Sequence, residues 1–406
     1  MAGGRATGDD GDWGHAADLE DVSGRIGVVG VGESDHSKAS GRTATECALS
    51  AIERALEDAG LEPGQIDGIM FLRHGEHVDA AAFHAHFGTS HDIWESGEGG
   101  GMRWAATAPH AAARAIAAGR AKYVVNSFAV AWATQRGEMT GGPGQSHAHE
   151  HFKQNAEVPF GWFPQPVYFA TIARRHMHEF GTTQEQLGEI AVALRYNANH
   201  TAGAVMRDRP LGLEEYLASP PIADPFRKED CCLISDGGGA QIFAPLERAA
   251  DHPKPVVEVA GVGLGRSHAG AYWSQQGAFT STPQVFAAPA GFAMAGIGPD
   301  DVDVLTAYDP FTIVSLMQIE DMGFCEKGAG GEFVSGGHLR FDGGGLPYNT
   351  HGGLLSHAYV LGIAHVVELV RQLRGEAEGH QVKDARVGVY GGYTGSEAST
   401  LVLRRR

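Results

Sequence analysis

Two glycine-rich turns are the clearest candidates for a reaction site. Gly99-Gly-Gly101 leads into an alanine-rich helical pattern, and Gly352-Gly353 leads into a second apolar helical pattern. The backbone N–H groups in the first turn of a helix have no partner within the helix, and they favour negative charge. Donors of this kind are typically worth ~3–4 kcal/mol at a developing oxyanion. We therefore expect these turns to bind a substrate oxyanion through Gly100, Gly101, Gly352 and Gly353.

The histidine and cysteine clusters are weaker candidates. His147-Ala-His-Glu-His151, His84-x-His86 and His176-x-His178 gather imidazoles, which are common metal ligands. Glycine and proline surround the first cluster, which favours a solvated loop. Cys231-Cys232 lies in an apolar strand context and is interpreted as part of the core. The spacing of Gly261-Val-Gly-Leu-Gly265 differs from a dinucleotide fingerprint, so we predict neither a metal nor a cofactor.

Composition narrows the classes of function. Lys and Arg number 31 against 49 Asp and Glu, which gives a formal net charge of −18. Such a surface repels nucleic-acid backbones and anionic lipid, so neither is an expected partner. No stretch approaches the ~18 consecutive apolar residues of a membrane helix. The four scattered cysteines do not suggest a disulfide framework, and we expect a protein of the reducing cytoplasm.

An internal repeat predicts the architecture. Ala59-Gly-Leu-Glu-Pro-Gly-Gln-Ile-Asp-Gly-Ile69 returns in the second half as Ala295-Gly-Ile-Gly-Pro-Asp-Asp-Val-Asp-Val-Leu305. Each copy has the pattern of a helix end, a turn and a new strand. After each glycine-rich turn we predict a helix and then a strand, at 105–118 and 123–125 in one half and at 358–373 and 387–390 in the other. A period this long indicates a duplicated α/β domain.

The repeat sets the expected domain boundaries. We predict a disordered acidic arm at 1–22, a first half at 23–250 and a second half at 251–406. Within the first half, residues 133–220 form a long insertion with a helix near 169–178. Two similar halves should pack about a pseudo-twofold axis, with their glycine-rich turns close together. The insertion would then cover a pocket built at the duplicated core.

Three further motifs complete a resemblance to a known family. They are Asp236-Gly-Gly-Gly-Ala240, Leu346-Pro-Tyr-Asn-Thr-His-Gly-Gly353 and Gln372-Leu-Arg-Gly375. In a duplicated α/β chain of this length they resemble the thiolase superfamily, in particular its sterol-carrier-protein and lipid-transfer branch, over roughly residues 24–403. The resemblance implies the duplicated thiolase fold, an α/β architecture layered α-β-α-β-α with two pseudo-twofold-related halves.

The resemblance also shows where this chain departs from true thiolases. Their nucleophilic Cys position falls on Met102, and a thioether is not a nucleophile of this kind. Their catalytic His positions fall on Tyr359 and on the first residue of Tyr308-Asp-Pro-Phe311. A late catalytic Cys is also gone, and Tyr390-Gly-Gly-Tyr393 stands there instead. We expect Met102 to line the substrate site without attacking the substrate.

This set of changes is similar to that of the steroid side-chain-cleaving aldolases of the superfamily. The resemblance implies retro-aldol cleavage of a bulky β-hydroxyacyl-CoA, with Tyr308 and Tyr359 as the acid–base pair. Asp309 and His351 are expected as polarising groups behind them, although Asp309 alternatively only caps a turn before Pro310. Because the ordinary pKa of tyrosine is ~10, the site must lower that pKa or share the proton through a network.

The resemblance implies partners as well. We expect an acyl-CoA thioester as substrate, a homodimer, and a small OB-fold acyl-CoA-binding protein as partner, with no cofactor beyond the CoA of the substrate. Two other functions stay open: a thiolase-like acyltransferase with an atypical nucleophile, and a non-catalytic acyl-CoA-binding scaffold. Tyrosines in place of the catalytic Cys and His argue against the acyltransferase. The same substitutions do not argue against the scaffold function, because an enzyme that becomes a scaffold also loses its nucleophile.

Overall fold

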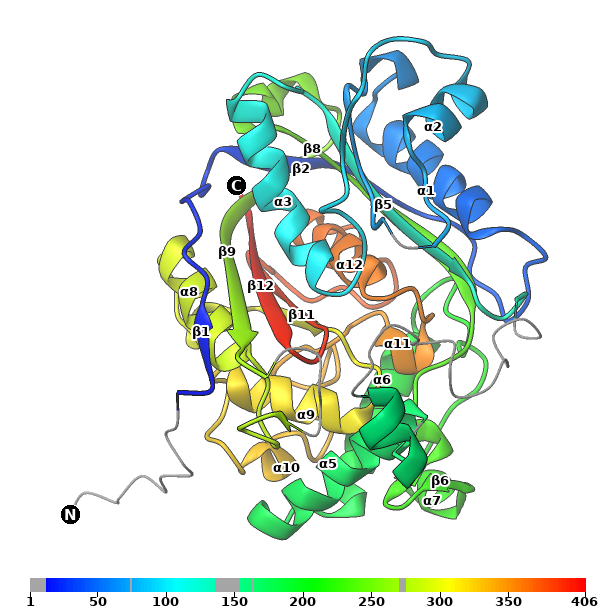
Figure 1. Cartoon of the computed structure of the whole chain (residues 1–406), viewed down its shortest axis with the longest axis vertical. Coiled ribbons are helices and arrows are strands. Elements are labelled where there is room, and N and C mark those ends of the chain that lie inside the picture. The colour runs from blue at the N-terminus through cyan, green and yellow to red at the C-terminus, as the bar shows by residue number, and fades with distance from the viewer. Residues whose placement is uncertain (1–11, 74, 136–152, 163, 270–274) are drawn as a thin grey trace.

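A ten-stranded mixed sheet runs through the molecule (Figure 1). The computed structural model describes residues 12–73, 75–135, 153–162, 164–269 and 275–406. The first half of the chain contributes β2 (Ile26–Glu33), β3 (Gly68–Met70), β4 (Trp94–Ser96), β5 (Val124–Ala131) and β8 (Asp236–Pro245). The second half contributes β9 (Val257–Ser267), β10 (Val304–Ala307), β11 (Val387–Tyr393) and β12 (Glu397–Arg405).

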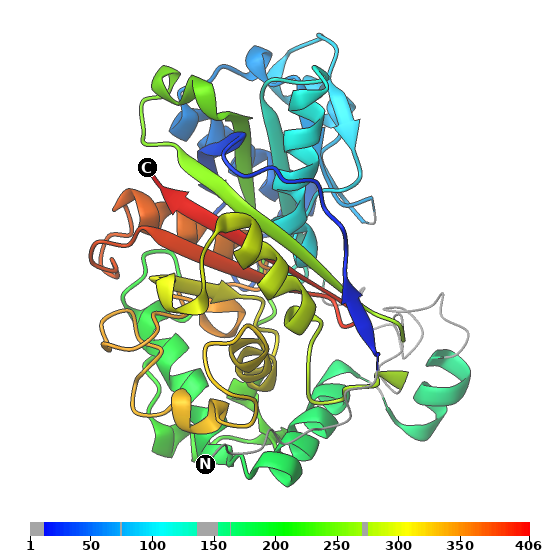
Figure 2. The same ribbon diagram turned by 90° about the vertical axis from the view of Figure 1, so that its left-hand side faces the viewer.

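The two halves have the same strand order, which confirms the duplication. The first half runs β2-β8-β5-β3-β4 across the sheet, and the second runs β9-β12-β11-β10. In each half the first strand lies beside the last one, and the strand from the repeated motif lies further out. The halves meet where β2 pairs antiparallel with β9, at Gly27–Glu258 and Val28–Val257. Figure 2 shows the first-half strands above those of the second half, with β9 running between them, whereas the green helices of the first half lie at the bottom.

Four helices complete the predicted layers. α1 (Ala44–Ala59) packs on β2, β8 and β5, and α8 (Gln284–Ala295) packs on β9 and β12, so each covers the outer face of its own half. α3 (Arg103–Ala117) and α12 (Ile363–Arg374) each contact strands of both halves, and therefore form the central layer. The arrangement is the expected α-β-α-β-α, and the chain folds locally as the repeat predicts.

The repeated motif forms the same local structure twice. α1 ends at Gly60 and α8 ends at Gly296, both left-handed with φ of 65° and 67°. That conformation favours glycine, which has no Cβ. A single 3₁₀ turn follows in each copy, at Pro63–Gln65 and at Pro299–Asp301, and then β3 or β10 begins.

The glycine runs in β2 and β9 are packing features, which agrees with the absence of a dinucleotide fingerprint. A Cβ on Gly32 would lie 2.3 Å from the carbonyl oxygen of Ala51 in α1. A Cβ on Gly263 would lie 2.0 Å from the carbonyl oxygen of Ala287 in α8. Both contacts are far inside van der Waals distance, so glycine allows each outer helix to rest directly on its strand.

A helical cap lies at one end of the layers. It contains α5 (Gln165–Phe180), α6 (Gln184–Asn199), α7 (Leu213–Ala218) and the hairpin β6 (Pro221–Ala223) and β7 (Phe226–Arg227), while α2 (Ala80–Phe87) lies in the opposite half. α6 packs on α9 (Thr312–Asp321), α10 (Gly330–Phe333) and α11 (Gly353–Ser356). The predicted helix near 169–178 is α5, and Gly181 ends it in the left-handed conformation.

Two expectations about element boundaries are wrong. Residues 12–22 of the predicted disordered arm are ordered: β1 (Gly14–Ala16) pairs with β9, Trp13 packs on Phe286 with ring centroids 4.8 Å apart, and Val22 is fully buried. The acidic composition of this segment concealed these apolar anchors. The helix predicted from 358 begins at Ile363, because Gly362 takes a left-handed conformation and the preceding residues form a loop. Among the described residues, no helix is long and apolar enough to cross a membrane.

Candidate active site

Tyr308 is fixed at the carboxyl end of β10. All four residues of that strand are buried, and the residue that follows it emerges at the edge where α/β sheets carry their sites. The Tyr308 N–H donates to the carbonyl oxygen of Gly391 on β11 over 2.8 Å. Its own carbonyl accepts from Gln318 Nε2 on α9 over 2.7 Å. The backbone of Tyr308 is therefore held by two separate elements.

Tyr359 belongs to the loop between α11 and α12. Its N–H donates to Ser235 Oγ over 2.8 Å, which ties this second-half loop to the segment before β8. Its ring is tilted against Trp132, with centroids 4.7 Å apart. The side chain of Tyr359 is thus oriented by residues of the first half.

The two tyrosine hydroxyls meet. Their oxygens are 3.2 Å apart, within hydrogen-bonding distance, and either one can be the donor. Tyr308 is 6% exposed and Tyr359 is 9% exposed. Burial raises the pKa of both hydroxyls above the ordinary range of tyrosine. Both therefore carry their protons at neutral pH, so the expectation of a lowered pKa is wrong, and proton sharing through the hydrogen bond stays a prediction.

Asp309 caps α11. Its carboxylate accepts from the Leu354 N–H at 2.9 and 3.0 Å and from the Leu355 N–H at 3.4 Å. His365 Nε2 lies 2.8 Å from its other side, and the residue is fully buried. Burial raises the pKa of Asp309, although His365 and the Leu354 N–H oppose that rise. Gly353 is required here, because a Cβ would lie 2.1 Å from Asp309 Oδ2.

His351 belongs to a row of buried imidazoles. Its ring centroid lies 4.6 Å from that of His365 and 4.9 Å from that of His357. Neither ring nitrogen of His351 has a hydrogen-bond partner among the described residues. Burial, together with the neighbouring His365, holds the pKa of His351 well below its usual range, so the ring is neutral. The predicted polarising role of His351 stays a prediction.

Several donors expected from the glycine-rich turns are already used. The Gly100 N–H donates to Asn126 Oδ1 over 2.7 Å, and the Gly352 N–H donates to the carbonyl oxygen of Asn349 over 2.7 Å. The expectation that Gly100 and Gly352 offer N–H groups to an oxyanion is therefore wrong. The Met102 N–H donates to the carbonyl oxygen of Leu361, so the first turn lies against the loop before α12. For Gly101 and Gly353 the oxyanion role stays a prediction.

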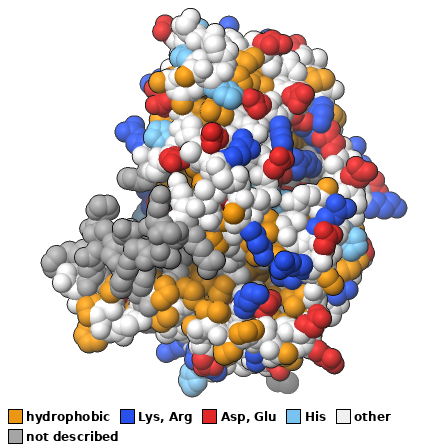
Figure 3. Space-filling model, turned by 90° about the vertical axis from the view of Figure 1, so that its right-hand side faces the viewer, with side chains coloured by type: hydrophobic (Ala, Val, Ile, Leu, Met, Phe, Trp, Pro, Cys, Tyr) orange, Lys and Arg blue, Asp and Glu red, His pale blue; other side chains and the backbone are white. Residues whose placement is uncertain are grey.

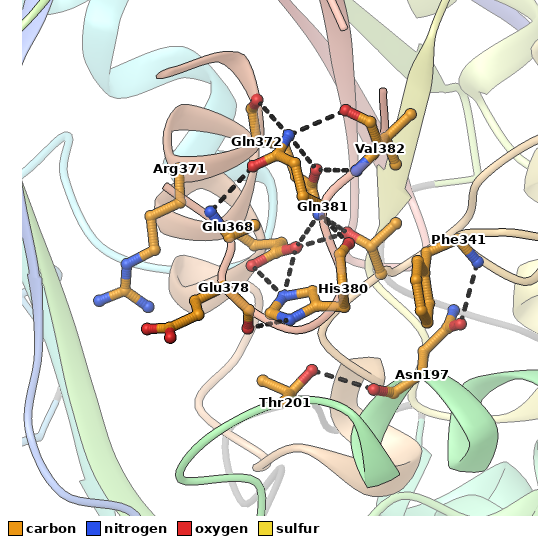
Figure 4. Close-up of polar contacts among 12 residues, drawn as sticks. Asn197, Thr201, Phe341, Glu368, Arg371, Gln372, Glu378, His380, Gln381 and Val382 are labelled. Carbon is orange, nitrogen blue, oxygen red and sulfur yellow. Dashed lines mark hydrogen bonds and ion pairs between the residues drawn. The ribbon is translucent and has the colours of Figure 1, made fainter. Parts of the chain in front are cut away.

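A polar network fastens the segment that leads to these glycines (Figure 4). Gln372 donates to Thr350 Oγ1 at 3.2 Å and to Glu368 Oε1 at 2.9 Å, while Gln381 donates to Gln372 Oε1 at 3.0 Å. Glu368 and His380 form a buried pair 3.0 Å apart. Burial opposes ionisation of Glu368, but His380 and the donors around it bring its pKa down to about 2. The hydrogen bonds of Gln372 therefore hold the chain segment that leads to the second glycine-rich turn.

Comparisons with known proteins agree with this geometry. Residues 265–405 match the thiolase C-terminal domain-like family. The chain is 34% identical to the steroid side-chain-cleaving aldolase of Thermomonospora curvata, over 94% of this chain and 98% of that one. It is 33% identical to the 17-hydroxy-3-oxo-4-pregnene-20-carboxyl-CoA lyase of Mycobacterium tuberculosis, over 94% of this chain and 100% of that one.

A solved structure shares the fold as well. The Ltp2-ChsH2(DUF35) aldolase superposes with a TM-score of 0.84 at 32% identity, covering 95% of this chain and 99% of that one. The chain belongs to the aldolase branch of the thiolase superfamily. The resemblance drawn from the sequence motifs is confirmed, and so is the assignment of the chain as an enzyme.

This aldolase has no activated nucleophile among its described residues. Met102 stands before α3 with φ of 49°, and its carbonyl oxygen accepts from the Tyr390 hydroxyl at 2.9 Å. Cys232 packs against the hydrophobic core. Burial raises the pKa of the Cys232 thiol well above its ordinary value. The thiol is therefore protonated, although it lies near the tyrosines.

The other histidine clusters of the aldolase have separate local roles. His84 Nδ1 lies 2.7 Å from Thr89 Oγ1, and His86 Nε2 lies 2.7 Å from Glu53 on α1. His176 is buried with Glu320 Oε2 3.0 Å from its ring, whereas its expected companion His178 is not in that pair. The cluster at 147–151 lies outside the described residues.

Some residues that shape the site could not be found by sequence reasoning. Gln318, Ser235 and Trp132 each contact a tyrosine, but they come from three distant segments. Their residue types are common and no spacing connects them. The row of His351, His357 and His365 does have a signal, because three histidines follow each other closely in an otherwise apolar region.

Proposed function

We propose that this aldolase cleaves a bulky β-hydroxyacyl-CoA, derived from a sterol or bile-acid side chain, into a ketone and a short acyl-CoA. The observation that supports this reaction most is the buried pair of neutral tyrosine hydroxyls 3.2 Å apart. A retro-aldol step needs one group to accept the β-hydroxyl proton and another to protonate the enolate carbon. Two linked hydroxyls supply both roles without a free tyrosinate.

All proton transfers of this reaction take place between the substrate and the two tyrosines. As the bond between the α and β carbons breaks, its electron pair moves into the thioester enolate and the β-oxygen becomes a ketone. One tyrosine accepts the hydroxyl proton while its own proton passes along the hydrogen bond to the other tyrosine. The second tyrosine gives its proton to the α carbon. Each side chain ends in its starting state, so the enzyme needs no external acid or base.

The steroid character of the substrate is supported by the two relatives. One is named for cleaving steroid side chains and the other for a pregnene carboxyl-CoA. Both align along nearly their entire length, so the substrate-binding segments are present here. The experiment is to incubate the protein with a 17-hydroxy steroid carboxyl-CoA and to detect the ketone and the short acyl-CoA by mass spectrometry. Absence of both products, with the partner protein present, would favour the scaffold function.

We propose two protein partners for the aldolase. The first is a second copy of the chain, since β4 forms an open edge of the sheet and an open edge favours pairing. The second is a small OB-fold acyl-CoA-binding protein, supported by the DUF35 component named with the solved relative. Figure 3 shows apolar side chains gathered on the lower part of one face. The large apolar side chains that are exposed among the described residues include Phe160, Phe180, Ile222 and Ile234.

The cytoplasm is the compartment proposed for this enzyme. Cys47, Cys231, Cys232 and Cys325 are all free thiols. Free thiols persist in a reducing compartment. No cofactor enters the proposed reaction, because the thioester of the substrate itself stabilises the enolate.

A further inference from the structure

Glu33, His36 and His357 form a second buried polar cluster. Glu33 is the last residue of β2, His36 follows it closely, and His357 lies in the loop that also carries Tyr359. The side chains are 9%, 3% and 4% exposed, respectively. Glu33 and His357 are 324 positions apart in the chain, so the cluster joins the two halves.

The ligand atoms converge. Glu33 Oε1 lies 3.2 Å from His357 Nε2 and 3.8 Å from His36 Nε2. One ligand atom from each of the three residues lies within 4.8 Å of the other two. A tetrahedral Zn²⁺ with bonds of about 2.0–2.2 Å places neighbouring ligand atoms roughly 3.4 Å apart. The three residues therefore need only small shifts to share one ion.

The surroundings leave the cluster open to a ligand. His36 Nε2 has no hydrogen-bond partner in the part of the chain that the structure describes. Gly237 makes room for that ring, because a Cβ there would lie 2.2 Å from His36 Cδ2. Arg371 pairs with the other oxygen, Glu33 Oε2, and points away from the Glu368 network (Figure 4). This contact orients the carboxylate and leaves Oε1 facing the imidazoles.

An entry path is present. A pocket of about 660 Å³ is lined by Glu33, His36, His357 and Arg371, together with Arg54 and Asp58. An ion bound by the three residues would thus have a fourth coordination position on the pocket side. Two histidines and one carboxylate with an open position form a common ligand set for Zn²⁺ and related ions.

We propose that Glu33, His36 and His357 bind one divalent transition-metal ion of the Zn²⁺ class. The ion links the end of β2 to the loop of Tyr359, and so fastens the first half of the molecule to the segment that carries a catalytic hydroxyl. The sequence-based expectation of no metal overlooked this set, since its members are scattered over both halves. The proposal is independent of the substrate.

The test is a metal titration of the chelator-treated full-length protein. Wild-type protein should bind one equivalent of Zn²⁺ by calorimetry, and Co²⁺ should give visible absorption bands of a site with nitrogen ligands. The variants His36→Gln and Glu33→Gln should each weaken binding by at least about 100-fold, since even outer partners of metal ligands typically contribute ~10–100-fold. Zn²⁺ should also raise the Tm of wild type but not of these variants.

His86→Ala is the matched control. It removes an imidazole that also faces a carboxylate, Glu53, but has no third ligand beside it. This variant should bind Zn²⁺ as wild type does. Circular dichroism must show that each variant is folded. The proposal is wrong if folded wild type binds no Zn²⁺ at micromolar concentration, or if His36→Gln binds Zn²⁺ as well as wild type does. If a variant fails to fold, the wild-type titration alone decides.

Discussion

At the scale of single residues, the proposed reaction depends on neutral hydroxyls. Tyr308 and Tyr359 stand at the two positions that match the catalytic His residues of thiolases, and burial keeps both tyrosines protonated. Their types and positions were predictable because the family motifs fix where catalytic side chains lie. Their mutual contact was not, since it depends on Gln318 and Ser235, which hold the two backbones from distant segments.

The first prediction concerns covalent chemistry. We expect no acyl-enzyme, because Met102 is a thioether and the thiols near the core are protonated. Burial raises the pKa of Cys231 and Cys325 to about 12, and it raises the pKa of Cys232 well above the ordinary value of a thiol. Only a thiolate attacks a thioester efficiently. Intact-mass analysis after incubation with an acyl-CoA should show the unmodified chain. A stoichiometric adduct that disappears in Cys232→Ala would instead support the acyltransferase.

At the scale of elements, the sequence predicts helix ends better than it predicts contacts between distant segments. The Thr43 and Glu46 capping box begins α1 as the sequence predicts, and Gly60 ends it. The start of α12 was misplaced because the loop from His357 to Leu361 retains an apolar, helix-like pattern while it is held by contacts with the first half. The sequence predicts that the Gly352 N–H binds a substrate oxyanion, whereas the carbonyl oxygen of Asn349 accepts from it. Sequence spacing cannot reveal such a competing acceptor.

The pair formed by Glu368 and His380 should make the free energy of unfolding decrease at acidic pH. The pKa of Glu368 is about 2 in the folded protein, against an ordinary value of 4.5. A lowered carboxyl pKa contributes stability that is complete above the unfolded-state value and is lost as the pH falls from about 4.5 toward about 2. Glu368→Gln should lower the free energy of unfolding by on the order of 3 kcal/mol at pH 7 and by progressively less below pH 4.5. Urea unfolding at pH 7, 5 and 4 measures the difference.

Glu378→Gln is the matched control for this measurement. Glu378 is exposed, and only its backbone carbonyl contacts His380, at 3.3 Å (Figure 4). The stability of this variant should match wild type at each pH. An equal loss in Glu368→Gln at pH 7 and pH 4 would show that the carboxylate acts through packing and not through its charge.

At the scale of the whole molecule, the duplication brings the chemistry together. The central helices α3 and α12 begin side by side, where the Met102 N–H donates to the carbonyl oxygen of Leu361. Residues of the first half also orient the second-half loop of Tyr359, as Ser235 does by accepting from the Tyr359 N–H. The repeat in the sequence predicted this architecture, but the cluster of Glu33, His36 and His357 became visible only once the halves were packed.

The assembly is the prediction that belongs to this scale. We expect a homodimer, or a two-plus-two complex with the OB-fold partner, because β4 is an edge strand of the sheet with no further described strand beside it. Light scattering at micromolar concentration should give about twice the chain mass of 42.9 kDa, or more with the partner. A stable species at the mass of one chain would contradict this expectation.

The central claim is that the two tyrosine hydroxyls carry the proton in carbon–carbon cleavage. The direct measurement is kcat for a β-hydroxyacyl-CoA, with the partner present, in Tyr308→Phe and Tyr359→Phe. Each change deletes one hydroxyl with almost no change in volume, so we expect kcat to fall ~10²–10⁴-fold while the fold survives. Tyr196→Phe, which deletes a hydroxyl bound to Asp342 far from the pair, should leave kcat unchanged. If both active-site variants cleave as fast as wild type, the tyrosine pair does not perform the reaction.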